Sequence, residues 1–168
     1  MIPVSLSWIA EQVNGQLIAQ QHPDLIISGV STDTRSIEPK DIFLALSGPN
    51  FDGHQFVHQA EEKGAIALIL SRKVDTTLPY VLVEDTKLAL GLLGAAVKAK
   101  VAPKTVGITG SSGKTTVKEM VASILSRRGK VLATKGNLNN DLGVPMTLLR
   151  LDEQHDFAVI EMGANHLG

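Results

Sequence analysis

The sequence predicts an α/β protein in which a small mixed α/β N-terminal unit is followed by the start of a parallel-sheet domain. The chain of 168 residues is 43% hydrophobic and 20% charged, enough to bury a core in one medium domain or two small ones. Short runs of branched apolar residues dominate the front half, whereas strand-like and helix-like segments alternate in the back half.

The front unit is expected over residues 1–84. Leu6, Ile9 and Val13 recur at helical spacing before Asn14-Gly15, a pair suited to a left-handed helix end, so residues 5–13 are predicted to form a helix. A second helix is predicted at residues 56–64, where the pattern ends at a glycine. The strands are predicted at residues 25–30, 42–46, 65–70 and 80–83.

The back unit is expected over residues 85–168. Asp85 or Thr86 is suited to cap a helix that runs to residue 100 on a stripe of Leu88, Leu92, Leu93 and Ala96, before Pro103 breaks the pattern. The following elements are predicted as strand 105–109, helix 114–127, strand 131–134, helix 144–151 and strand 157–161. The helix at 114–127 is expected to pack through one apolar face, formed by Val117, Met120, Val121, Ile124 and Leu125. This βαβαβ order implies a parallel sheet with helices packed around it.

Composition excludes several classes of function. The formal net charge of −1 gives no field for attracting nucleic acid or an anionic membrane surface. The absence of cysteine excludes a disulfide framework, a thiolate zinc site and a cysteine nucleophile. The start of the chain has neither a signal peptide nor a membrane span. We therefore expect a cytoplasmic monomer with no nucleic-acid partner and no membrane insertion.

A glycine-rich segment between the strand at 105–109 and the helix at 114–127 is typical of a phosphate-binding loop. Backbone N–H groups of such a loop point at phosphate oxygens, Lys114 would neutralise β- and γ-phosphate charge, and the Thr115 hydroxyl is suited to bind Mg²⁺. The strict motif has a glycine where this chain has Ile108, so the loop is a variant. The alternative is a glycine-rich turn with a fortuitous lysine. The residues predicted to bind ATP are Gly110, Ser111, Ser112, Gly113, Lys114, Thr115 and Thr116.

Further polar residues follow the next two strands. Glu161 ends an apolar strand, and in a parallel sheet that end lies at the same edge as the phosphate loop, so Glu161 is predicted to bind the metal with Thr115. The alternative is a glutamate that faces solvent. The asparagines of the segment 136–140 are suited to grip phosphate or carboxylate, or else to form a turn that caps the next helix. Asn165 and His166 are two more candidate substrate contacts, although a lone histidine is more often structural or solvated.

These segments together resemble the Mur ligases of bacterial peptidoglycan synthesis. The asparagine-rich segment and the string Glu161-Met162-Gly163-Ala164-Asn165-His166 are most similar to the members that add D-Ala-D-Ala. In the front unit, the segments 31–35 and 51–54 are similar to the domain of this family that holds the UDP end of the substrate. The resemblance implies that the substrate-binding residues include Ser31, Asp33, Arg35, Asp52, Gly53, His54, Asn137, Asn140, Asn165 and His166.

The resemblance implies an ATP-dependent amide ligation. The substrates would be UDP-MurNAc-tripeptide and D-Ala-D-Ala, the cofactors ATP and Mg²⁺, and the intermediate an acyl phosphate, with Lys114 and Glu161 as catalytic residues. Residues 1–84 would bind the UDP-sugar, and residues 85–168 would form the first, incomplete part of the ATP-binding central domain. Because the family continues through a third domain, we expect a truncated chain that is inactive alone.

Other functions remain open at this point. A different Mur-type ligase would add a single amino acid, and a non-catalytic module would bind a UDP-sugar and a nucleotide without turnover. A small-molecule kinase would share the phosphate loop, as would a GTPase, although the sequence has neither a lid arginine for the first nor a base-reading motif for the second. Arg35 and Asp33 also have a simpler interpretation as a solvated pair at a strand end.

Overall fold

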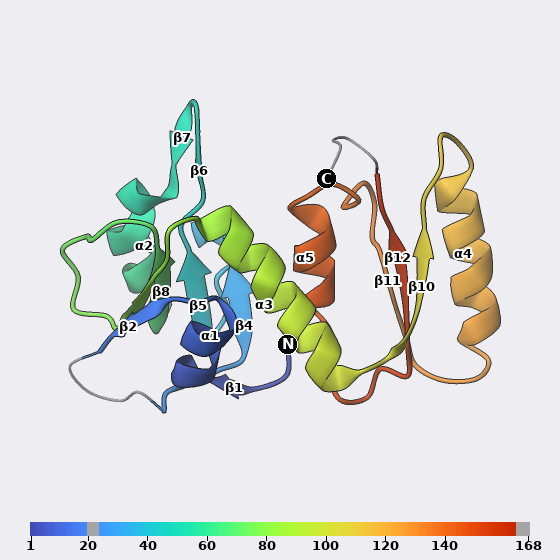
Figure 1. The fold of residues 1–168 in the computed structure, drawn as a ribbon, viewed down its shortest axis with the longest axis horizontal. Coiled ribbons are helices and arrows are strands. Elements are labelled where there is room, and N and C mark those ends of the chain that lie inside the picture. The colour runs from blue at the N-terminus through green and yellow to red at the C-terminus, as the bar shows by residue number, and fades with distance from the viewer. Residues whose placement is uncertain (20–23, 164–168) are drawn as a thin grey trace. The chain divides into compact units, whose positions relative to one another are not determined.

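The computed structural model of the chain describes residues 1–19 and 24–163 (Figure 1). It has the predicted mixed α/β class, and its contacts form two compact units, one from Met1 to Leu93 and one that starts at Gly94. The division falls inside helix α3, Thr86–Val101, whose first turn is capped by the Asp85 carboxylate. The assignment of separate roles to residues 1–84 and 85–168 stays a prediction.

The first unit is built on a five-stranded sheet with the order β2-β9-β8-β5-β4. The four strands from β9 to β4 are parallel to their neighbours, and β2 is antiparallel to β9. Strands β5 and β8 are buried at every position, which explains why continuous apolar runs encode them. The strands are β2 Gln16–Ile18, β4 Gly29–Ser31, β5 Asp41–Leu44, β8 Ala67–Leu70 and β9 Tyr80–Leu82.

The predicted strand at residues 25–30 is in fact two strands in different sheets. Strand β3 pairs antiparallel with β1, whereas β4 joins the large sheet beside β5. Between them the Ser28 N–H donates to the Lys40 carbonyl at 3.0 Å, and the chain changes partners there. The short strands are β1 Val4–Ser5, β3 Ile26–Ile27, β6 Ser47–Gly48 and β7 Phe51–Asp52.

Helical segments complete the first unit. The predicted cap of helix α1, Leu6–Gln12, is present, because Asn14 adopts a left-handed φ of 53° and the Gly15 N–H donates to Ala10. Helix α2, Val57–Glu62, follows a 3₁₀ turn at Gly53–Phe56, and another 3₁₀ turn lies at Thr34–Ser36. Among the described residues, no helix combines the length and apolar character needed to cross a membrane.

The second unit contains the predicted parallel sheet. Its order is β10-β12-β11, with β10 Lys104–Ile108, β12 Phe157–Glu161 and β11 Val131–Ala133. Both pairings are parallel, with Ile108 opposite Glu161 and Ala133 opposite Val159, so the carboxyl ends of the strands lie at one edge. The helices are α4 Lys114–Leu125 and α5 Gly143–Leu148.

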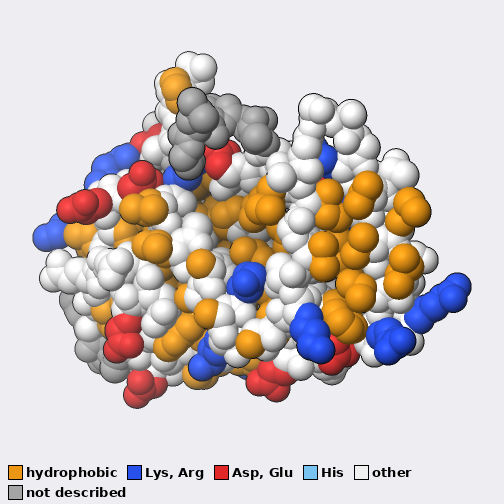
Figure 2. Space-filling model, turned by 45° about the vertical axis from the view of Figure 1, so that its right-hand side comes forward, with side chains coloured by type: hydrophobic (Ala, Val, Ile, Leu, Met, Phe, Trp, Pro, Cys, Tyr) orange, Lys and Arg blue, Asp and Glu red, His pale blue; other side chains and the backbone are white. Residues whose placement is uncertain are grey.

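Two predicted apolar helix faces differ from the observed burial. On α4 the residues Val117, Met120 and Ile124 are 47%, 60% and 64% exposed, and Figure 2 shows hydrophobic side chains gathered over this helix. On α3 the predicted stripe is wrong at Leu88, which is exposed, and correct at Leu93, which is buried. The other buried apolar residues of α3 are Ala89, Leu90 and Val97. The periodicity identified both helices, but it identified only part of the buried face of α3 and not the exposure of the apolar face of α4.

Candidate active site

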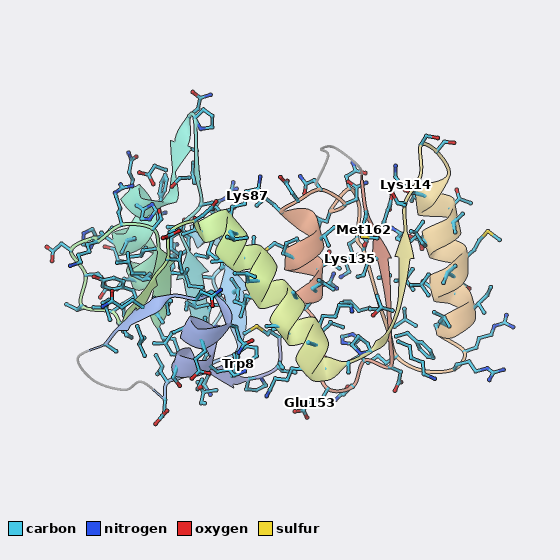
Figure 3. All side chains as sticks on the ribbon, in the orientation of Figure 1. Trp8, Lys87, Lys114, Lys135, Glu153 and Met162 are labelled. Atoms are coloured by element: carbon cyan, nitrogen blue, oxygen red, sulfur yellow. The ribbon has the colours of Figure 1, made fainter. Side chains whose placement is uncertain are left out.

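The segment predicted to bind phosphate forms a compact loop between β10 and α4. Gly110 and Gly113 adopt φ values of 147° and 76°, a left-handed region that a side chain would strain. The Lys114 ammonium reaches back across the loop and donates to the Gly110 carbonyl at 2.7 Å. Figure 3 shows Lys114 at the N-terminal end of α4, where the helix dipole adds positive potential. A loop of this kind at a helix N-terminus is a common site for phosphate, and phosphate binding by this loop stays a prediction.

Glu161 meets this loop at Thr115. The Thr115 hydroxyl lies 3.3 Å from Oε1 and 3.4 Å from Oε2 of the Glu161 carboxylate, although 46 residues separate the two in sequence. The Glu161 side chain is buried, at 3% exposure, so the alternative of a solvent-facing glutamate is wrong. The parallel pairing of β10 with β12 produces this contact by bringing the end of β12 beside the loop.

Lys118 and Thr134 hold Glu161 from the protein side. The Lys118 ammonium donates to the Thr134 carbonyl at 2.8 Å and lies 3.8 Å from Oε2 of Glu161. The Thr134 hydroxyl accepts the backbone N–H of Glu161 at 2.9 Å. Neither residue was predicted to belong to the site, because a lysine and a threonine outside a motif carry no signal of their own.

The asparagine-rich segment contacts Glu161 and caps helix α5. Asn139, which is not among the substrate-binding residues that the resemblance implies, points its amide nitrogen at Oε1 of Glu161 at 3.5 Å, and its carbonyl accepts the Gly163 N–H. Asn140 accepts the Gly143 N–H at 2.7 Å, the helix-capping role that the sequence left open. Asn137 is exposed. Contacts of Asn137 and Asn140 with substrate stay predictions, and Asn165 and His166 lie outside the described residues.

The oxygen donors of this site fit a magnesium ion. Mg²⁺ in nucleotide sites is bound by one or two carboxylates or hydroxyls together with phosphate oxygens and water, not by an all-protein cage. Thr115 and Glu161 supply one hydroxyl and one carboxylate at the phosphate loop. Across residues 1–19 and 24–163 no group of three or more His, Cys, Asp or Glu side chains is arranged to hold a metal ion.

A cavity of about 440 Å³ lies in the first unit beside the end of β4. The rings of Phe51 and Phe56 line it and stack with centroids 5.6 Å apart. Asp33 and Arg35 also line it and form the exposed pair that the sequence left open, with Nη2 of Arg35 2.6 Å from Oδ2 of Asp33. The hydrogen bonds from Arg35 lower the pKa of Asp33 to about 2. Ser31 supports this turn by donating to the Asp33 carbonyl.

Asp52 and His54 form a separate network. The His54 ring is fully buried, with Nδ1 2.7 Å from Oδ1 of Asp52. Burial opposes ionisation of Asp52, but hydrogen bonds from the His54 backbone and ring and from Arg72 outweigh it and hold the pKa of Asp52 well below its usual range. Gly53 packs so tightly that an added Cβ would lie 2.8 Å from the Leu46 carbonyl oxygen. In this conformation His54 supports Asp52 from inside the unit and cannot touch a ligand.

Two family models match the chain. The model of the Mur ligase family, catalytic domain, matches residues 26–127, and that of the Mur ligase middle domain matches residues 108–168. The two ranges together include the cavity of the first unit, the phosphate loop and Glu161.

Curated relatives align over the whole chain. The UDP-N-acetylmuramoyl-tripeptide--D-alanyl-D-alanine ligase of Escherichia coli K12 is 53% identical over 168 residues, which are 100% of this chain and 36% of that relative. The Bacillus subtilis ligase of the same name is 40% identical over 171 residues, 100% of this chain and 37% of that relative. The chain thus spans a little over a third of the length of these relatives.

Solved structures have the same fold. MurF from Acinetobacter baumannii matches with a TM-score of 0.93 and 47% identity over 99% of this chain and 37% of that one. The MurF ligase of Thermotoga maritima in complex with ADP matches with a TM-score of 0.76 and 34% identity over 83% of this chain and 33% of that one.

Proposed function

This chain belongs to the Mur ligase family, and from that premise we propose that it forms part of an ATP-dependent ligase that adds D-Ala-D-Ala to UDP-MurNAc-tripeptide. The juxtaposition of Thr115 and Glu161 beside the phosphate loop carries the proposal, because it offers one site for both a triphosphate and its metal ion. The names of the aligned relatives support the choice of substrates. ATP and a UDP-sugar as reactants favour the cytoplasm, and a monomer remains our expectation.

The proposed reaction has two successive steps. A carboxylate oxygen of the tripeptide attacks the γ-phosphorus of ATP, the bond to the β,γ-bridging oxygen breaks, and ADP leaves. The amine of D-Ala-D-Ala then attacks the acyl carbon of the acyl phosphate, inorganic phosphate leaves, and the amine loses a proton as the amide forms. The first step brings two anions together, so its barrier falls when positive charge surrounds the γ-phosphate.

The second unit would supply that charge and orientation. The N–H groups of the loop from Gly110 to Thr116 would hold the phosphate oxygens, and Lys114 would leave the Gly110 carbonyl to contact the β- and γ-phosphates. Thr115 and Glu161 would hold Mg²⁺, which offsets the charge on the phosphates when bound. Helix α4 and strand β12 fix the spacing of these groups.

The first unit would hold the nucleotide end of the UDP-sugar. The stacked rings of Phe51 and Phe56 give the cavity an apolar wall suited to a nucleobase, and Arg35 at its edge is suited to a pyrophosphate. Asp33 already pairs with Arg35, so the diphosphate would have to compete for the guanidinium or use its second face. Asp52, Gly53 and His54 would act by fixing the 47–52 hairpin that carries Phe51.

The test uses the full-length protein and follows phosphate release together with product mass. Release of phosphate from ATP should require both UDP-MurNAc-tripeptide and D-Ala-D-Ala, and the product should gain the mass of the dipeptide less water. The Lys114→Ala variant should lose this activity by a factor of about 100 or more. Turnover with a single amino acid would support a different Mur-type ligase. Tight binding of ATP and of the UDP-sugar without any turnover would support the non-catalytic module.

A further inference from the structure

Lys118 is a buried cation to which the proposed reaction assigns no role. Within α4, which the structure describes in full, it is the one buried side chain, at 2% exposure, whereas its neighbours Val117 and Met120 are exposed. Burial of a lysine costs free energy unless its charge and its N–H donors find partners. The partners of Lys118 therefore indicate the role of this buried lysine.

Those partners are the ends of the two strands that flank the proposed metal site. The Lys118 ammonium donates to the carbonyl of Thr134, which follows β11, at 2.8 Å. It lies 3.8 Å from Oε2 of Glu161 at the end of β12. Its contact with Glu119 is 3.2 Å, but the Glu119 side chain is 70% exposed, so that pair is screened by water. The buried interaction is the one with Glu161.

Neighbouring polar groups contact both carboxylate oxygens and the backbone N–H of Glu161. Lys118 faces Oε2, while the Asn139 amide nitrogen faces Oε1 at 3.5 Å. Thr134 links Lys118 to Glu161, because its carbonyl accepts from Lys118 and its hydroxyl accepts the Glu161 N–H at 2.9 Å. Thr115 and Lys118 are three residues apart, which places them on the same face of α4.

We propose that Lys118 is a positioning residue that holds the Glu161 carboxylate against the Thr115 hydroxyl, so that both ligands are in place before Mg²⁺ binds. This inference rests on the magnesium role proposed for Thr115 and Glu161. Lys118 acts through Glu161 and does not contact the metal itself. Groups that orient a metal ligand typically change metal affinity by a factor of about 10 to 100.

The direction in which metal affinity changes when Lys118 is replaced distinguishes a positioning role from a purely electrostatic one. An ammonium beside a metal ligand repels an incoming cation, so removal of its charge alone would strengthen metal binding. If Lys118 instead holds the Glu161 carboxylate in place, its replacement would weaken metal binding. Lys118→Met keeps a side chain of similar length without charge, and we expect it to weaken metal binding about tenfold.

The experiment measures metal binding directly in the full-length protein. Mn²⁺ is titrated in the presence of a non-hydrolysable ATP analogue, and water proton relaxation reports the Mn²⁺ that is bound to the macromolecule. The Mn²⁺ dissociation constant of Lys118→Met should rise about tenfold over that of the wild type. An unchanged or lower constant would overturn the inference. Glu119→Gln, which removes only the exposed partner of Lys118, is the matched control and should leave the constant unchanged.

Two further measurements separate this role from a contribution to stability and from the proposed function. Lys118→Gln keeps an N–H donor for Thr134 and is measured in the same way in case Lys118→Met does not fold. The midpoint of thermal unfolding without metal or nucleotide reports stability alone, and a purely structural role would lower it while the Mn²⁺ constant stays the same. If the wild type binds no Mn²⁺ in the presence of the analogue, the proposed metal site itself is wrong. If the wild type binds Mn²⁺ and both Lys118 variants have the same dissociation constant as the wild type, only the role of Lys118 is wrong.

Discussion

The backbone N–H of Ser71 donates to Nε2 of His54 at 2.9 Å, across 17 residues of sequence. Since Nε2 accepts this bond, the ring proton is on Nδ1 and is donated to Asp52 at 2.7 Å, so both nitrogens of a buried ring are satisfied. The ring joins the 3₁₀ turn at Gly53–Phe56 to the residue that follows β8.

His54→Leu should therefore destabilise the first unit. The substitution keeps an apolar body but leaves the Ser71 N–H without its acceptor, which costs about 1–3 kcal/mol. Trp8, the single tryptophan of the sequence, lies in α1 of the same unit, so its fluorescence during urea unfolding of the 168-residue chain reports the loss. His58→Leu on the exposed side of α2 is the control and should change stability by less than about 0.5 kcal/mol.

Asp52 should make the stability of this unit depend on pH in the acidic range. Its folded pKa lies below the ordinary value of 3.8, so the folded state favours the ionised form. The resulting stabilisation is fully present above the unfolded pKa of about 3.9 and is lost as the pH falls through the folded pKa. The difference in unfolding free energy between the wild type and Asp52→Asn should be constant from pH 7 to 5 and shrink below pH 4.

Urea titrations at several pH values, again followed by Trp8, measure this difference. Arg72→Gln removes one of the donors that stabilise the ionised carboxylate and should reproduce part of the effect of Asp52→Asn. A difference that does not vary with pH would mean that Asp52 stabilises the unit through packing and neutral hydrogen bonds alone.

Close packing at Gly143 ties the asparagine-rich segment to helix α5. A Cβ added at Gly143 would lie 2.5 to 2.7 Å from backbone atoms of Leu138, which cannot move without displacing Asn139. Gly143→Ala should therefore cost about 1–3 kcal/mol and also reduce ligation by the full-length protein. Gly91→Ala is the opposite case, since nothing lies within 4 Å of its added Cβ in the interior of α3. It should stabilise the chain by about 0.5–1 kcal/mol, and thermal unfolding compares the two.

The sequence predicted the elements whose burial determines their composition. The strand at residues 157–161 matches β12 at both ends, because four apolar residues followed by a carboxylate describe a buried strand that ends at a polar edge. Strands β1, β6 and β7 have two residues each, too few to show any period, and they were not predicted. The exposed face of α4 was predicted as a packing face, because periodicity shows that a helix is amphipathic but not what covers it.

The candidate site was predicted where residues form a local motif and missed where they meet through the fold. The phosphate loop is contiguous, and Glu161 follows from the rule that parallel strands end at one edge. Lys118 is different, since a lysine in a helix normally lies at the surface, and only the strand order β10-β12-β11 brings Glu161 and Thr134 to its ammonium. Asn139 could not be separated from Asn137 and Asn140 without the backbone of the turn.

Asn140 allows its capping role and its predicted substrate contact to be tested separately. Its Oδ1 accepts the Gly143 N–H, which leaves the amide nitrogen as the group for a substrate. Asn140→Asp keeps the acceptor and should leave stability unchanged, but the KM for UDP-MurNAc-tripeptide should rise about tenfold because a donor is replaced by a negative charge. Asn140→Ala should lose about 1 kcal/mol of stability as well. If Asn140→Asp is wild-type in both stability and KM, capping is the only role of the residue.

Thr115 gives the most direct test of the proposed metal site, because two substitutions separate its hydroxyl from its methyl group. Thr115→Ser keeps the oxygen that lies 3.3 Å from Glu161, whereas Thr115→Val keeps the branched shape and removes that oxygen. Thr115 is exposed at the start of α4, so neither change should alter stability by more than about 0.5 kcal/mol. In the full-length ligase the valine variant should lower kcat by a factor of about 100 and require more Mg²⁺, while the serine variant should stay close to the wild type. A valine variant with the kcat and the Mg²⁺ requirement of the wild type would move the magnesium site away from Thr115.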